Sequence, residues 1–331
     1  MRHRIPAVLL LTVALLGGLG WTAESWAQEK LPRVGYLLTF VKGTNDALVG
    51  VLEETLTRTL AGHGWIEGKN VLIERRTALG EPPRFDEPAA ELVRSNVDII
   101  CAESAPATRA AYAATRTIPI VALDFTNDPV AAGYVESYGR PGRNITGVFL
   151  DAPEFATKWL ELLKAVVPHL SRVVVLWDPS PGATHLNALQ AAAPAFGVKL
   201  QVVEVHKPED IDKAFAALPG RPQALIILPS PLTWAQSARL AELAKKHRLP
   251  ATSMARQFAQ SGGALAYGPD LTAGVGRLAD ILAKVLSGAM PADLPVERPA
   301  KIELVVNLKT AKVLGLAIPQ SILLRADEVI K

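Results

Sequence analysis

Hydrophobic residues along this chain form short apolar runs that alternate with longer stretches of helical periodicity. The run 33–39 is brief and almost continuously apolar, which predicts a buried strand of a parallel sheet. Asn45 then has the character of a helix N-cap, and the stretch from there to about Gly62 predicts an amphipathic helix. Its apolar positions are Leu48, Val51, Leu52, Leu56 and Leu60. A strand followed by such a helix is typical of a βαβ unit.

The same alternation continues as far as residue 253. The further strands that it predicts are 71–75, 97–101, 118–123, 173–177, 200–205, 224–228 and 250–253. The helices that it predicts between them are 85–94, 107–115, 153–167, 183–196, 208–217 and 234–247. Strands that alternate with helices of this length predict an α/β fold built from parallel sheets.

The alternation falls into two series, which lie on either side of the loop 140–144. In the first series the run 98–101 leads to Ser104-Ala105-Pro106 and a helix. In the second the run 224–228 leads to Ser230-Pro231 and a helix. This local likeness predicts two doubly wound lobes. A single large sheet is the alternative, because open sheets of eight or more strands exist.

The last part of the chain has a different rhythm. A predicted strand at 264–267 is followed by a predicted helix at 270–287. A proline-rich stretch at 291–299 then leads to a predicted strand at 302–306. One helix and one strand separated by a proline-rich crossing predict that the chain returns to the first lobe and then goes back to the second.

The first 27 residues have the pattern of a secretory signal peptide. Arg2 and Arg4 precede an apolar run at 7–19, and small residues stand at Ser25 and Ala27, before a cut after Ala27. A membrane anchor is the alternative, but an apolar run of about 13 residues is short of the roughly 20 that span a bilayer. No cysteine stands at the junction for lipid attachment. We therefore expect an exported, soluble mature chain.

Composition excludes several classes of protein. Hydrophobic residues make up 49% of the chain and charged residues 20%, which is typical of a folded protein and not of a disordered one. The net charge of +3 includes no basic block, so we expect no nucleic-acid partner. The single cysteine, Cys101, excludes an internal disulfide and is predicted to be a buried, unreactive strand residue. The six histidines are scattered, and we expect neither a metal nor a cofactor.

The sequence lacks the motifs that carry catalysis. It contains no Walker loop, no Gly-x-Ser-x-Gly elbow, no His-Glu-x-x-His and no paired-cysteine motif. Gly274-Val275-Gly276 falls within a predicted helix and not at a strand-to-helix turn, so a dinucleotide site is not expected. A secreted α/β enzyme would therefore have no visible nucleophile and base. We predict a binding protein and not an enzyme.

Polar and aromatic residues collect where the predicted strands end, which is the edge at which open α/β sheets bind ligands. The candidate ligand-binding residues of the first lobe are Thr39, Phe40, Glu103, Ser104, Asp124, Phe125 and Thr126. Those of the second lobe are Asp178, Ser230 and Arg256, and Tyr267 lies on the returning strand. For the serines and threonines, ordinary turn or cap chemistry is the alternative.

Arg256, Phe125 and Tyr267 are the strongest of these candidates, because a cation and aromatic faces in a cleft have few capping duties. Arg256 and Phe125 both follow predicted strands. We expect them to face each other across the cleft, with Arg256 binding an anionic group of the ligand.

Several longer motifs point to a family. They are IPIV at 118–121, NDPV at 127–130, RPGRNITG at 140–147, YGPDL at 267–271, IELVVNLKTAK at 302–312 and LLRADEV at 323–329. These motifs resemble the periplasmic substrate-binding proteins of ABC importers, in the branch that includes tryptophan- and tyrosine-binding members. The resemblance runs from about Arg33 to the C-terminus.

The resemblance implies the type I periplasmic binding architecture, with two α/β lobes joined by three hinge crossings. Lobe one would comprise residues 31–146 and 267–292, and lobe two residues 147–266 and 293–331, after a signal peptide at 1–27. The protein would be a periplasmic monomer that captures a small organic molecule, amino-acid-like or aromatic, and delivers it to an ABC permease in the inner membrane. An extracytoplasmic module that senses such a ligand for a signalling partner is the alternative.

Overall fold

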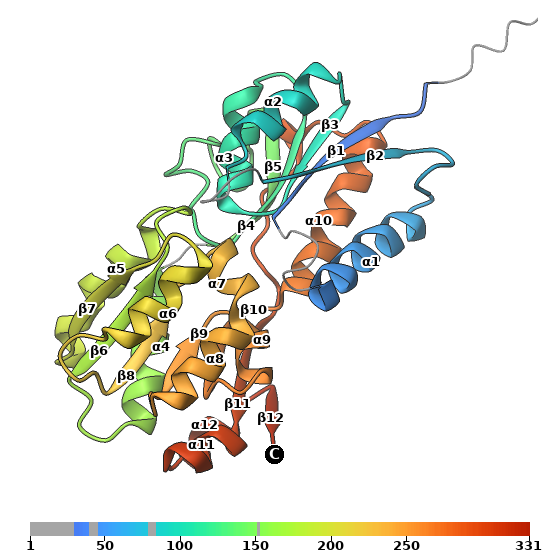
Figure 1. Cartoon of the computed structure of the whole chain (residues 1–331). Helices are drawn as coiled ribbons and strands as arrows, with labels where there is room; N and C mark the ends of the chain where they lie inside the picture. The colour runs from blue at the N-terminus through green and yellow to red at the C-terminus, as the bar shows by residue number, and fades with distance from the viewer. Residues whose placement is uncertain (1–29, 40–45, 79–83, 151–152) are drawn as a thin grey trace, which may run out of the picture. The chain divides into compact units, whose positions relative to one another are not determined.

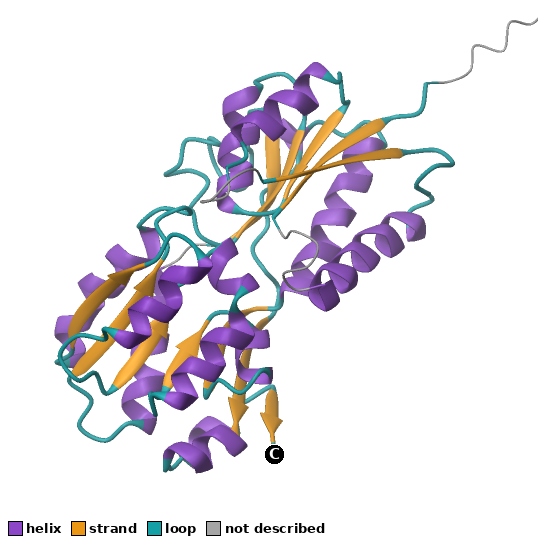
Figure 2. Cartoon of the chain, viewed as in Figure 1, coloured by secondary structure: helices purple, strands orange, loops and turns teal. Residues whose placement is uncertain are grey.

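The computed structural model describes residues 30–39, 46–78, 84–150 and 153–331. The predicted signal peptide and Phe40 lie outside the described residues. Residues Pro32–Lys331 form one compact unit that contains two separate sheets (Figures 1 and 2). Among the described helices, none is both long enough and apolar enough to cross a membrane.

The first sheet has five parallel strands in the order β2-β1-β3-β4-β5. The strands are β1 (Arg33–Leu38), β2 (Leu72–Thr77), β3 (Ile99–Ala102), β4 (Ile120–Asp124) and β5 (Ile145–Phe149). All five strands end at one edge of the sheet, because they are parallel. This strand order places β1 and β3 side by side at the point where the winding of the chain reverses, which is where ligands bind in such sheets.

Helices cover both faces of the five-stranded sheet (Figure 1). They are α1 (Asp46–Gly62) and α10 (Leu271–Leu286) on one face, and α2 (Asp86–Arg94) and α3 (Ala105–Ala114) on the other. Alternate residues of β1 serve the two faces: Tyr36 packs in the core beside α1, and Leu37 packs in the core beside α2 and α3. Cys101 is fully buried on β3, as predicted, and burial raises the pKa of its thiol.

The second sheet has seven strands in the order β12-β11-β10-β9-β8-β6-β7. They are β6 (Arg172–Trp177), β7 (Lys199–Glu204), β8 (Ala224–Ile227), β9 (Ala251–Ser253), β10 (Leu265–Pro269), β11 (Ile302–Asn307) and β12 (Glu328–Ile330). Pairing is parallel from β7 to β10, but β11 runs antiparallel to β10. The chain leaves β10 for α10, which packs on the first sheet, and it then re-enters the second sheet from the edge at which it left. A strand that re-enters from that edge must run antiparallel.

Helices also pack on the second sheet (Figure 2). They are α4 (Pro153–Val166), α5 (Thr184–Ala192), α6 (Pro208–Ala216), α7 (Pro231–Ala235), α8 (Ser237–Lys246), α9 (Arg256–Gln260), α11 (Leu308–Leu314) and α12 (Gln320–Leu323). The largest fully buried side chain is Trp159 on α4. Its indole Nε1–H donates to the carbonyl oxygen of Tyr267 at 2.9 Å, which ties α4 to β10.

The structure differs from the predicted elements at a few places. The helix predicted at 234–247 is two helices, α7 and α8, which meet at Gln236. The strand β5 and the short elements α9, α11, α12 and β12 were not predicted. β5 reads ITGVF and carries a glycine at its centre, so its pattern is weak. The short elements are too brief for a period to be visible in the sequence.

The chain passes between the two sheets three times. The first passage follows β5 and the second follows β10. The third precedes β11, after Glu297 has paired with β5 through two backbone hydrogen bonds of 2.9 Å. The lobe boundaries stay a prediction. By strand pairing, residues 147–149 belong to the first sheet and residues 267–269 to the second. Residues 293–297 lie beside the first sheet, where Glu297 pairs with β5.

Gly147 makes the close packing of β5 against β4 possible, and Gly147→Ala should destabilise the protein by more than about 2 kcal/mol. Gly147 has φ +146°, and a methyl group there would collide with the backbone oxygen of Ala122, its register partner on β4. Urea unfolding of the ligand-free protein measures the effect. Gly50→Ala is the control: Gly50 lies in α1 with open space around it, so alanine should stabilise by about 0.5–1 kcal/mol. Equal effects of the two substitutions would contradict the role of Gly147.

Candidate ligand-binding site

A cavity lies where strand ends of the two sheets come together. About 500 Å³ of this region is not filled by protein atoms, and that volume includes open solvent. Its polar lining residues are Thr39, Glu103, Ser104, Thr126 and Ser230. Its apolar lining residues are Leu123, Phe125, Trp234, Met254, Leu271, Ala105 and four prolines at positions 106, 181, 229 and 231.

Strand direction explains why these residues meet. Three lining residues directly follow strands of the first sheet: Thr39 follows β1, Glu103 follows β3 and Phe125 follows β4. Met254 stands immediately after β9, and Ser230 begins the turn into α7 after β8. Because parallel strands end at a common edge, residues far apart in sequence line a single cavity.

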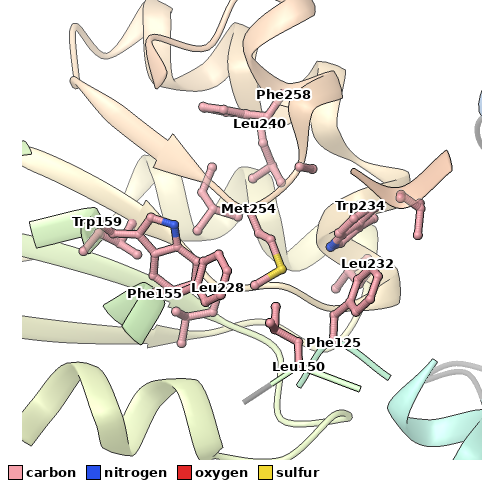
Figure 3. Close-up of a cluster of buried hydrophobic side chains, with 14 of the residues drawn as sticks. Phe125, Leu150, Phe155, Trp159, Leu228, Leu232, Trp234, Leu240, Met254 and Phe258 are labelled. Carbon is pink, nitrogen blue, oxygen red and sulfur yellow. The ribbon is translucent and has the colours of Figure 1, made fainter. Parts of the chain in front are cut away.

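The apolar wall of the cavity includes two aromatic rings, one that follows β4 of the first sheet and one on α7, which packs on the second sheet. Figure 3 shows Phe125 and Trp234 with Met254 and Leu232 in one cluster of buried side chains. The Phe125 ring lies against α10, where a Cβ on Gly274 would come within 2.8 Å of it, so the glycine leaves room for the ring. This wall can contact an aromatic group of a ligand.

Glu103 is the charged residue of the lining, and it is 5% exposed. Its Oε2 accepts a hydrogen bond of 2.7 Å from the Tyr36 hydroxyl, whereas its Oε1 is buried and has no partner among the described residues. Burial raises the pKa of the Glu103 carboxyl to about 7, against the bond from Tyr36, which lowers it, and with a smaller increase from the charge of Glu53. The Thr39 hydroxyl donates to the Glu103 carbonyl oxygen and holds the turn. Glu103 therefore lines the cavity and carries one carboxylate oxygen that no described residue satisfies.

The two serines of the lining also cap helices, which was the alternative reading of their role. Ser104 Oγ accepts from the Ala107 N–H at 3.3 Å at the start of α3. Ser230 Oγ accepts from the Thr233 N–H at 3.1 Å, and Thr233 Oγ1 accepts from the Ser230 N–H at 2.9 Å. Capping fixes the position of each hydroxyl at the cavity wall.

Six of the predicted site residues line this cavity: Thr39, Glu103, Ser104, Phe125, Thr126 and Ser230. The two aspartates among the predictions do not. Asp124 is fully buried and accepts hydrogen bonds from Thr126 and Asn127. Asp178 accepts from the Ser180 N–H and hydroxyl, both at 2.9 Å. Both carboxylates organise the turns that follow their strands and do not line the cavity.

Arg256 does not line the cavity either, and it does not face Phe125 across it. Its guanidinium forms ion pairs with Glu328 at 2.6 Å and with Glu303 at 3.0 Å. Arg256 is the first residue of α9, and its side chain extends to β11 and the start of β12, where these two carboxylates stand. The structure thus places Arg256 in an ionic cluster that joins α9 to the edge of the second sheet.

Tyr267 lines a second cavity, which shares no lining residue with the first. Its ring packs against Phe155 with the centroids 5.5 Å apart. Leu150 and Ile302 are among the other residues that line this cavity.

Trp234 and Met254 also line the site; Trp234 was not expected there, whereas the sequence places Met254 at the ligand-facing end of a strand of the second lobe. The sequence assigned Trp234 to the start of a helix. Ser230 follows the end of a predicted strand, and Trp234 stands four residues after it, which is the signal that could have placed Trp234 at the site. Met254 directly follows a predicted strand. Within the described part of the chain, no group of three or more His, Cys, Asp or Glu side chains could hold a metal ion.

Comparisons with known proteins identify a family and proteins of similar fold. A family profile described as ABC transporter substrate binding protein matches residues 44–330. A protein of Clostridioides difficile strain R20291 named tyrosine-binding protein is 26% identical over 263 residues, which are 78% of this chain and 75% of the relative.

Two solved structures are similar over 91% of this chain and 100% of their own. One is a conserved domain protein of Vibrio cholerae, with TM-score 0.81 and 26% identity. The other is an ABC domain from Streptococcus pneumonia in complex with L-Trp, with TM-score 0.80 and 22% identity. The second likeness bears on the fold alone.

Arg256→Ala should lower the free energy of unfolding by roughly 1–3 kcal/mol, because it removes a cation from Glu303, whose side chain is 4% exposed. Chemical denaturation of the ligand-free protein measures the loss. Arg239→Ala is the control, because Arg239 pairs with the exposed carboxylates Asp212 and Glu242, so its loss should cost less stability than the loss of Arg256. Unchanged stability of Arg256→Ala would show that the ionic cluster does not support the fold.

Glu103→Gln should change how the stability of the ligand-free protein depends on pH. The pKa of Glu103 is about 7 in the folded state against an ordinary value of 4.5, so the folded state holds an extra proton between these pH values. Stability should therefore fall, relative to Glu103→Gln, as pH rises from about 5 to about 8, by on the order of 3 kcal/mol.

Urea denaturation of both proteins at a series of pH values measures this difference. Glu242→Gln, on the surface, is the control and should follow the parent protein. Parallel stability curves for the parent and Glu103→Gln would show that Glu103 titrates normally.

Proposed function

The chain belongs to the family of ABC transporter substrate-binding proteins, and from this membership we propose that it captures a small aromatic, amino-acid-like molecule for delivery to an ABC permease. The observation that carries the proposal is the cavity with Phe125 from the first sheet and Trp234 from the second. A relative supports the chemical class, since the similar protein of Clostridioides difficile is named tyrosine-binding protein.

The lining of the cavity suits such a ligand. An aromatic side chain buries about 150–250 Å², and at about 25 cal/mol per Å² its burial contributes roughly 4–6 kcal/mol before the costs of association. The apolar wall offers this burial. Glu103, Ser104 and Thr126 offer polar atoms that would orient the rest of the molecule.

Capture needs no chemical step. The family consists of transport binding proteins and not of enzymes. The three passages between the sheets would act as a hinge, and a ligand that contacts both Phe125 and Trp234 would favour the closed state, because only there are both contacts made.

The family and the sequence pattern both support a place of action outside the cytoplasm. The family is one of extracytoplasmic binding proteins. We propose that the chain is exported, cleaved after Ala27 and active as a periplasmic monomer that meets its permease at the inner membrane. N-terminal sequencing of the exported protein tests the cleavage site, and recovery of Met1 would contradict it.

Trp234→Leu and Phe125→Leu should each weaken the binding of L-tryptophan or L-tyrosine by roughly tenfold, because leucine keeps apolar area but loses the aromatic face. Calorimetric titration of both amino acids measures the affinity. Tyr267→Leu is the matched control, because Tyr267 lines the second cavity, and its affinity should stay within about twofold of the parent protein. If Tyr267→Leu alone lost binding, the ligand would have to bind in the second cavity and not in the first.

A further inference from the structure

We propose that Glu103 receives the positively charged amine of the ligand, so that the protein selects aromatic amino acids over aromatic acids that lack the amine. The proposal deepens the proposed function and rests on it. It rests on Oε1 of Glu103, which has no partner among the described residues, and on the place of Glu103 in the cavity lining.

The position of Glu103 points to a partner in the cavity. Oε2 accepts a hydrogen bond from the Tyr36 hydroxyl at 2.7 Å, and Oε1 is buried with no partner in the part of the chain that the structure describes. Buried carboxylate oxygens are almost always bonded, because an unsatisfied one loses its hydration without compensation. Glu103 lines the cavity, so a donor carried by the ligand can reach the residue there.

The charges around Glu103 favour a cationic donor. The ionisable groups that act on it come from three elements: Tyr36 on β1, Cys101 on β3 and Glu53 on α1. None of these is a cation, and Glu53 pairs with Arg75 at 3.0 Å. Among the described residues, no basic side chain forms an ion pair with Glu103. An ammonium group would supply both the missing hydrogen bond and the missing charge.

A protonated Glu103 that donates to a ligand carboxylate is the competing arrangement, and the two differ in the direction of proton exchange. Burial raises the pKa of Glu103 to about 7, so the empty site is largely protonated at pH 6. An ammonium ligand must displace that proton. Its binding therefore releases a proton and tightens as pH rises from about 5 to 8, by up to tenfold per pH unit below 7. A carboxylate ligand held by protonated Glu103 would show the opposite dependence.

The first experiment compares two probes that differ in the amine alone, L-tryptophan and indole-3-propionate, by calorimetric titration of the parent protein at pH 7.5. The pair L-tyrosine and 3-(4-hydroxyphenyl)propionate repeats the comparison for a phenol ring. We expect the amino acid of each pair to bind at least tenfold more tightly than the acid without the amine. Titration of the amino acid at pH 6 in two buffers of different ionisation enthalpy should show proton release.

The second experiment uses Glu103→Gln, which keeps the size of the side chain and removes its charge. We expect it to bind the amino acids about ten- to a hundredfold more weakly and to bind the acids without the amine within about threefold of the parent protein. Glu53→Gln is the matched control, because Glu53 is a nearby carboxylate that does not line the cavity. It should stay within about threefold for every probe.

The outcomes separate this proposal from the one on which it rests. Equal binding of both members of a pair, proton uptake, or unchanged amino-acid affinity in Glu103→Gln would overturn the role of Glu103 and leave aromatic capture standing. Failure of the parent protein to bind any of the four probes would overturn aromatic capture, and the role of Glu103 with it. The probe comparison and the proton count use the parent protein, so they decide the matter even if Glu103→Gln folds poorly.

Discussion

The direction of the strands is the constraint on which the rest of this structure depends. A parallel strand can be followed only by a chain segment that leaves from the same edge as its neighbours, so every residue placed just after a strand arrives at that edge. Thr39, Glu103 and Phe125 meet in this way in the first sheet, and Ser230 and Met254 in the second. The cavity is thus built from positions that are local in the sequence and become neighbours only through strand pairing.

Charge is distributed differently in the scaffold and in the cavity. Arg256 is paired with Glu303 and Glu328, and Arg75 with Glu53 and Glu67, so these cations are compensated within the fold. In the cavity lining the ionisable group is an acid, Glu103, one oxygen of which has no partner among the described residues. An unpaired buried charge costs stability, so ionisation of Glu103 is unfavourable until a ligand compensates its charge. This arrangement is typical of a binding site that trades stability of the empty state for selectivity.

Because the chain passes between the sheets, each sheet contains or packs against segments that follow the other in sequence. Helix α10 covers the first sheet although it follows a strand of the second, and β11 runs antiparallel because it returns from the first sheet. Glu297 pairs with β5 just before that return, through hydrogen bonds to Phe149 and Gly147. Parts of the chain that are distant in sequence are therefore interleaved, and the two sheets can neither fold nor be cut apart as two continuous segments.

The sequence by itself determined the alternation of strands and helices, because apolar runs and helical periods are local signals, and it determined six lining residues, because they directly follow or adjoin strands. It did not determine which partner the side chain of a residue after a strand contacts. Arg256 turns to Glu303 and Glu328, which lie 47 and 72 residues along the chain, and Trp234 enters the cavity from a helix. β5 became a strand through its pairing with β4, with Gly147 allowing the approach. Only the tertiary structure decided these outcomes, because the partners that fix each side chain are contributed by distant segments.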